Sequence, residues 1–174
     1  MKIIDKINDK LKKKEKFYSF EYFPPKTEGG IDNLIERIER MSSLNPQWVD
    51  ITWGAGGTTS DSTLFLSSYI QNYLNIDCLM HLTCRCQSKD NIDKALEEAK
   101  KNGIMNILAL RGDPPQGTIN YDSSKDYFQY ANDLVKYIRV CKLFNYSNNT
   151  VTIFVLLSLD TQKPMLNLKV RRKT

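Results

Sequence analysis

The strongest constraint on the fold is a fourfold alternation of a short apolar run with a segment of helical periodicity. The apolar runs occupy residues 17–23, 48–53, 78–84 and 105–112, at a spacing of about 30 residues. In the segments between them, apolar residues recur every three or four positions, as on one face of a helix. Strands that alternate with helices in this way form a parallel sheet with crossover helices. The sequence therefore predicts an α/β protein.

Polar residues and helix breakers mark where these helices are expected to start and stop. The expected ends are Asp32 and Pro46 for the first helix, Asp61 for the start of the second, Ser88 and Gly103 for the third, and residues 126–139 for the fourth. Two lysines precede Gly103, as the helix macrodipole favours.

Residues 1–16 form a basic extension before the first apolar run. The apolar side chains of this extension fall on one helical face and are Ile3, Ile4, Ile7 and Leu11. A solvated amphipathic helix is expected, and a helix on a membrane surface is the alternative. The extension has neither the apolar core nor the cleavage site of a secretory signal peptide.

Two closures of a parallel sheet are compatible with this order, an open doubly wound sheet and the barrel of eight βα units. A doubly wound nucleotide fold would carry a G-x-G-x-x-G turn after its first strand, and residues 23–30, "FPPKTEGG", lack that spacing. Polar residues instead follow or end every apolar run, and they are Glu21, Thr52, His81, Thr83, Arg111 and Asp113. Barrel enzymes build their sites at that end of the strands, so the barrel is favoured.

Charge and cysteine content exclude several classes of protein. The net charge of +5 arises in residues 139–174, which hold seven basic residues and one acidic residue, so the remainder is nearly neutral. This distribution argues against a nucleic-acid-binding protein, and no apolar run is long enough to span a membrane. The four cysteines follow no disulfide pattern, and a cytoplasmic protein with reduced thiols is expected.

Two titratable residues are candidates for chemistry. Glu21 lies among Phe20, Tyr22 and Phe23, and apolar neighbours would raise its pKa as a general acid requires. The alternative is an exposed carboxylate at a strand end, paired with a lysine. His81, the only histidine, is either functional or a buried core residue. With its neighbouring cysteines it forms too weak a pattern for a zinc site, and no metal is expected.

The segment "RGD" ends the fourth apolar run. Gly112 between two charged residues would let the backbone pass close to a ligand. A local ion pair between Arg111 and Asp113 is the structural alternative. An extracellular adhesion tripeptide would require a different cellular context from the one that the cysteines indicate.

Five linked segments, "YSFEYFPPKT", "VDITWGAGGTTSDST", "HLTC", "NGIMNILALRGDPPQG" and "YANDLVKYIR", closely resemble the eukaryotic catalytic domain of methylenetetrahydrofolate reductase. The resemblance covers about residues 17–139 in register. It implies the (βα)8 barrel, here as its first four units, with FAD as cofactor. The implied reaction passes hydride from NADPH through the flavin to 5,10-methylenetetrahydrofolate and yields 5-methyltetrahydrofolate, in one-carbon and methionine metabolism. It also implies a homo-oligomer for an intact member.

The resemblance also assigns residues to roles. Glu21 matches the general acid that protonates the bridging nitrogen of the folate, and Asp113 matches a carboxylate near the flavin and the pterin. The positions that match flavin contacts are Thr52, Trp53, His81, Arg111, Gly112, Asp113, Tyr130 and Ala131.

Residues 140–174 depart from the family pattern, which continues with a fifth strand and a Gly-Tyr-Pro motif. The possible codons of Val140, Cys141 and Lys142 resemble the start of an intron, and codons further on allow the family motif in a shifted frame. The tail is therefore interpreted as retained intron followed by out-of-frame exon, and a divergent tail is the alternative. Residues 152–159, "TIFVLLSL", are apolar enough to cover the open edge of the fourth strand as a substitute strand.

Three functional hypotheses follow for a chain of this kind. The first is a working flavoenzyme, and the second is a truncated, non-catalytic fragment of that enzyme. The third is a binding module that uses its basic tail on nucleic acid or a membrane. The missing fifth-strand motif favours the second hypothesis for the 174-residue chain itself.

The tail interpretation makes a prediction about the transcript. In the spliced messenger RNA, the codon for Arg139 should be followed by a shifted frame that encodes Gly-Tyr-Pro at the family spacing. Sequencing complementary DNA across this codon measures it directly. A transcript that is collinear with residues 140–174 would show a genuine tail.

Overall fold

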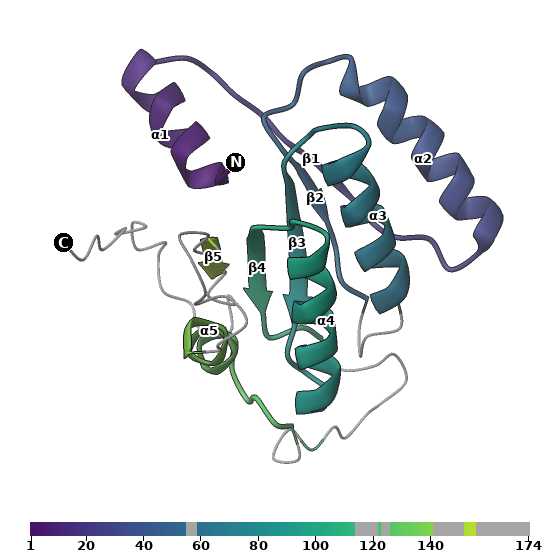
Figure 1. Ribbon diagram of the computed structural model, residues 1–174, viewed down its shortest axis with the longest axis vertical. Coiled ribbons are helices and arrows are strands. Elements are labelled where there is room, and N and C mark those ends of the chain that lie inside the picture. Colours follow the sequence, from purple (N-terminus) through teal and green to yellow (C-terminus); the bar gives the residue numbers. More distant parts are fainter. Residues whose placement is uncertain (55–58, 114–121, 123–125, 141–151, 156–174) are drawn as a thin grey trace.

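The computed structural model describes residues 1–54, 59–113, 122, 126–140 and 152–155 (Figure 1). In this part of the chain a helix precedes four βα units and a final strand. The helices are α1 (Ile3–Lys13), α2 (Glu28–Ser42), α3 (Ser60–Asn72), α4 (Lys89–Lys101) and α5 (Ala131–Val140). The strands are β1 (Phe20–Tyr22), β2 (Val49–Ile51), β3 (Cys78–Thr83), β4 (Asn106–Leu110) and β5 (Thr152–Val155).

The described strands form one parallel sheet in the order β1-β2-β3-β4-β5. Each strand therefore lies beside its neighbour in sequence, with a helix crossing between the first four in turn. A doubly wound sheet reverses its strand order at a switch point, whereas a barrel keeps the sequential order. The observed order is that of a barrel, and the α/β prediction is confirmed.

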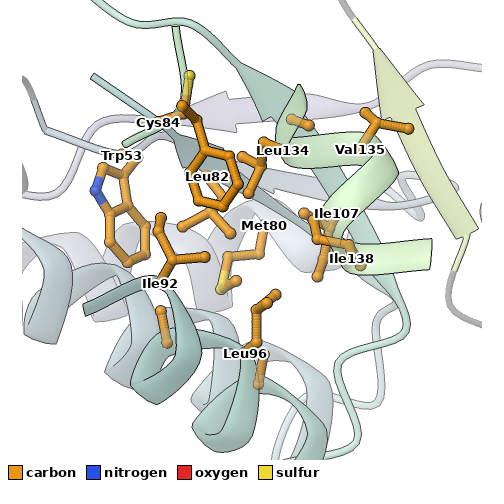
Figure 2. Close-up of a cluster of buried hydrophobic side chains, with 14 of the residues drawn as sticks. Trp53, Met80, Leu82, Cys84, Ile92, Leu96, Ile107, Leu134, Val135 and Ile138 are labelled. Atoms are coloured by element: carbon orange, nitrogen blue, oxygen red, sulfur yellow. The ribbon is translucent and has the colours of Figure 1, made fainter. Parts of the chain in front are cut away.

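One face of the sheet packs against the helices α2 to α5. Because side chains alternate along a strand, Met80 and Leu82 of β3 and Ile107 of β4 all point to this face. They meet Leu96 of α4 and Leu134 of α5 in one apolar core (Figure 2). A second cluster joins β1 and β2 to α2 and α3. The helical faces expected from periodicity are the buried ones.

Helix α1 lies on the opposite face of the sheet, near the starts of the strands (Figure 1). Ile3 is fully buried against Leu79 and Leu108, and its backbone N–H donates to Asn106 Oδ1 at 2.9 Å. Lys6 Nζ lies 2.6 Å from a carboxylate oxygen of Asp77. The expectation of a solvated helix is therefore wrong for this apolar edge of α1, because the inner face of the sheet offers it an apolar surface.

Two helix starts differ from the sequence expectation. Thr27, rather than Asp32, caps α2, and its hydroxyl accepts the N–H of Gly30 at 3.2 Å. Gly30 fits into this first turn because a Cβ there would lie 2.8 Å from Pro25 Cβ. Helix α5 begins at Ala131 instead of residue 126. The cap at Ser88 is confirmed, since its hydroxyl accepts the N–H of Asn91 at 3.1 Å.

A polar contact joins α4 to α5. Asp93 accepts hydrogen bonds from Lys89 Nζ, at 2.6 Å, and from the Tyr137 hydroxyl. The hydrogen bond to Asp93 raises the pKa of Lys89 above its ordinary value. This polar contact joins the first turns of α4 to the second half of α5, and the two helices also share the main apolar core.

Strand β5 lies along the free edge of β4. Thr152 pairs with Asn106 and Ile153 with Ile107 in parallel register, and the Ile153 side chain packs against the main core. The prediction of a substitute strand is confirmed for Thr152–Val155, while residues 156–159 lie outside the described part of the chain. An apolar segment can fill this place because backbone groups make the ladder.

Replacing Ile153 with aspartate should lower the free energy of unfolding by about 2 kcal/mol, because a charge would enter the core edge. The β4 edge would also be uncovered, so aggregation should rise. Chemical denaturation and light scattering measure the two effects. Leu44→Asp is the matched control, since Leu44 is 52% exposed and should tolerate the charge. Equal effects of the two variants would contradict the packing of β5.

Candidate active site

The candidate site lies on the face of the sheet opposite α2 to α5, toward the carboxyl ends of the strands. Because Tyr22, Ile51, Met80 and Leu82 point to the helices, their neighbours in each strand point to this inner face. The inner-face polar residues are Glu21 on β1, Asp50 and Thr52 on and after β2, and His81 and Thr83 on β3. Four of the six residues predicted from the strand ends thus share one face, and Arg111 and Asp113 follow β4 directly.

Glu21 is exposed to solvent in the described part of the chain. The expectation that its aromatic neighbours bury it is wrong. Tyr22 turns to the helix side of the sheet, where it is buried, and Phe23 is itself exposed. Glu21 is backbone-paired with Asp50 of β2 through the register of the sheet. Its carboxylate therefore stands on the open inner face, next to the strand that carries a second acid.

Asp50 is a residue that sequence reasoning missed. Its Oδ1 lies 3.6 Å from Nε2 of His81, and both side chains are about nine-tenths buried. The two residues are diagonal neighbours, because the register partner of Asp50 is Leu79, two positions before His81. The only available signal was an acidic residue inside a three-residue strand between two buried apolar residues, Val49 and Ile51.

Backbone bonds hold Thr52 at the end of β2. Its N–H donates to the carbonyl of Tyr22 at 3.0 Å, which extends the ladder between β1 and β2. Its own carbonyl accepts the hydroxyl of Thr63 on α3 at 2.9 Å. Thr52 is therefore fixed from both sides and buried, as a residue that orients a ligand should be.

The segment after β4 is held against the end of β3. The N–H of Cys84 donates to the carbonyl of Leu110, and the N–H of Arg85 donates to that of Arg111, both at 3.0 Å. The Arg111 guanidinium carbon lies 5.4 Å from the ring centre of Tyr130, at the start of α5. Two residues predicted from the family resemblance, 19 positions apart in sequence, thus meet at the strand ends.

Gly112 adopts a φ of +82°, and a Cβ there would lie 2.8 Å from Thr83 Cβ. Both the left-handed backbone and the close approach require glycine. The sequence expectation attributed this glycine to the approach of a ligand, and the observed neighbour is the Thr83 side chain. Asp113 follows and is exposed.

Trp53 differs from the residues around it. Its side chain is buried in the core between the sheet and the helices, together with Met80 and Ile92 (Figure 2). It therefore points away from the inner face, and the flavin contact that the resemblance implies at this position stays a prediction. Ala131 is buried as the first residue of α5, directly after Tyr130.

The buried cysteines at the two ends of β3 are poor nucleophiles. Burial raises the pKa of Cys78 to about 12 and that of Cys84 to about 11. Both thiols are therefore protonated at neutral pH. In the described segments no three metal-binding side chains come together, and all three described cysteines are free. Likewise, none of the helices assigned between residues 3 and 140 has the length and hydropathy needed to cross a membrane.

Sequential parallel strands with crossover helices are typical of the (βα)8 barrel fold, in which sites lie at the carboxyl ends of the strands. A family model described as methylenetetrahydrofolate reductase matches residues 6–156. The chain belongs to the methylenetetrahydrofolate reductase family, whose fold is the eight-unit barrel. The match includes most of α1, from Lys6 onward, and all of β5, on either side of the motifs that carry the resemblance.

Curated relatives support the same assignment. The chain is 48% identical to methylenetetrahydrofolate reductase (NADH) 1 of Arabidopsis thaliana and 49% identical to the protein of that name from Zea mays. It is 35% identical to the probable methylenetetrahydrofolate reductase (NADPH) of Caenorhabditis elegans. These matches cover 80%, 80% and 78% of the chain, but only 24%, 23% and 21% of the relatives. The chain thus spans less than a quarter of the length of these relatives.

Gly112→Ala should lower the free energy of unfolding by about 3 kcal/mol, because alanine adds both left-handed strain and a clash with Thr83. The matched control is Gly103→Ala. Gly103 has a φ of +71°, but a Cβ added there would meet no atom within 4 Å, so the strain alone should cost about 1 kcal/mol. Urea unfolding measures both variants, and equal losses would contradict the close approach.

Proposed function

We propose that this chain supplies the first half of the flavin site of a reductase that converts 5,10-methylenetetrahydrofolate into 5-methyltetrahydrofolate. The observation that supports it best is the gathering of Glu21, His81 and Arg111 at the strand ends of a chain of this family. The proposed setting is the cytoplasm, and the proposed assembly of the intact protein is a homo-oligomer. We propose neither a nucleic acid nor a membrane as partner.

The inner face suits a large polar cofactor such as FAD. One of its buried polar atoms, Thr83 Oγ1, has no hydrogen-bond partner among the described residues. Buried polar atoms are normally satisfied, so such an atom beside an open face suits a ligand that bonds to it. Beside it, Arg111 and the 58%-exposed ring of Tyr130 offer a cation and an aromatic surface. A bound FAD would supply the redox chemistry, by accepting and returning a hydride.

The residues of this chain would then act on the folate. Glu21 would donate a proton to the bridging nitrogen, which opens the five-membered ring and leaves an iminium carbon ready to accept hydride. Its exposure on the inner face makes it accessible to a substrate. Asp113, also exposed, would place a negative charge near the cofactor and help to orient the pterin. Thr52, Gly112 and the backbone of Ala131 would complete the contacts.

The nucleotide that provides the hydride is proposed only as a reduced nicotinamide. The sequence resemblance suggests NADPH, but two of the relatives carry NADH in their names and the third carries NADPH. Parallel assays with NADH and NADPH at equal concentration would separate them.

A second candidate function is that of a non-catalytic fragment. In the described part of the chain five strands are present, and Glu21 lies on the edge strand β1, exposed to water. An open site loses preorganisation and admits water. We therefore expect the 174-residue chain alone to purify without flavin absorbance and without reductase activity. A yellow, active preparation of the chain would contradict this candidate.

In a protein that combines this segment with the remaining strands of the family, Glu21→Gln should abolish folate reduction and leave flavin reduction by the nicotinamide nearly unchanged. The reason is that the proton is needed only at the folate nitrogen. Stopped-flow absorbance at the flavin band measures each half-reaction separately.

The matched control is Glu28→Gln, since Glu28 is an exposed acid in the first turn of α2. It should leave both half-reactions unchanged. Equal loss of both half-reactions in Glu21→Gln would remove the proton-donor role. A control variant as inactive as Glu21→Gln would show that the loss is not specific to position 21.

A further inference from the structure

The contact between Asp50 and His81 is the feature of the inner face that the family motifs did not assign. Asp50 Oδ1 and His81 Nε2 are 3.6 Å apart, and the exposed fractions of the two side chains are 11% and 8%. His81 Nε2 is buried and has no hydrogen-bond partner within the described residues. A small movement of the imidazole ring would therefore bring His81 Nε2 within hydrogen-bond distance of the Asp50 carboxylate.

The surroundings favour a fixed orientation of the ring. Asp50 is held in a three-residue strand whose neighbours Val49 and Ile51 are both buried in the core. His81 lies in the middle of β3, and its register partner is Leu108. Neither backbone can shift without disturbing the core on the other face. The Asp50 carboxylate is thus held at a fixed position beside the imidazole of His81.

We propose that Asp50 is a positioning residue for His81. Its carboxylate accepts the Nε2–H of the imidazole, so that Nε2 carries a hydrogen in both protonation states of the ring. Nδ1 is then the ring nitrogen that remains for a ligand on the inner face. Histidines that bind ligands are commonly oriented in this way by an acceptor on their other nitrogen.

This proposal rests on the proposed function only for the identity of the ligand. If the inner face binds flavin, Asp50 prepares His81 for that contact. The orientation of the ring itself is a property of the chain without any ligand. The orientation of the His81 ring and the binding of flavin can therefore be tested, and rejected, independently.

Nuclear magnetic resonance of the 174-residue chain tests the orientation without assignment work, because His81 is the only histidine. With ¹⁵N-labelled histidine at a pH where the ring is neutral, Nε2 should be the protonated nitrogen and its hydrogen should exchange slowly. Asp50→Leu keeps the branching at Cγ but removes the acceptor, so this hydrogen should exchange at least about tenfold faster. Asp50→Asn keeps an acceptor oxygen and should retain slow exchange.

A role in packing alone predicts that Asp50→Leu and Asp50→Asn both exchange like the parent chain. Asp90→Leu, on the exposed start of α4, is the control and should leave the ring signal unchanged. The proposal is overturned if His81 is protonated on Nδ1, or if Asp50→Leu leaves the exchange rate unchanged.

Should a 174-residue variant aggregate, the same spectra are recorded on the protein extended by the family's remaining strands, with the same expectation. A separate flavin titration of that extended protein tests the proposed function. If the extended protein binds flavin but Asp50→Leu leaves the exchange rate of the His81 Nε2 hydrogen unchanged, only the role of Asp50 is rejected. If Asp50→Leu speeds this exchange but the extended protein binds no flavin, only the proposed cofactor is rejected.

Discussion

The parallel pairing of β3 with β4 is the interaction on which the rest of this structure depends. Five residue pairs, from Leu79 with Asn106 to Thr83 with Leu110, join the two strands, and every residue of β3 is buried. The helix side of this pair carries the main core, and the other side carries His81. Beyond the ladder, two further backbone bonds bring Arg111 to the same edge. The main core and the candidate site thus lie on opposite faces of the same pair of strands.

Much of this arrangement follows from the sequence because it depends on local patterns. The spacing of apolar runs predicts the sheet, and Ser88 marks a helix start through a short-range bond to Asn91. The sequence expectation places the start of α2 at Asp32 instead of Thr27, although Thr27 caps the helix through an equally short-range bond from Gly30. The side on which Trp53 lies was also missed, since the family motif indicates a ligand contact but does not specify whether the side chain provides it.

Some residues of the candidate site could likewise be predicted from local sequence, and others could not. Glu21, His81 and Arg111 could be predicted, because each is a polar residue at or beyond the middle of an apolar run. Asp50 could not, because its partner lies 31 residues further along the chain and only the strand register brings the two together. The surroundings of Glu21 were also beyond local reasoning. Its aromatic neighbours in sequence point elsewhere, so its burial depends on whatever covers the inner face.

Strand β5 has a consequence for the life of such a chain in a cell. Backbone pairing with β4 accepts Thr152–Val155 although this segment lacks the family's motif, because the ladder needs only peptide groups and an apolar side chain such as Ile153. Chaperones and proteases respond to exposed apolar surface and to the population of open states. A chain with this edge covered should therefore persist longer than one without it. The sheet can therefore be completed, and the chain stabilised, by a segment that adds nothing to the candidate site.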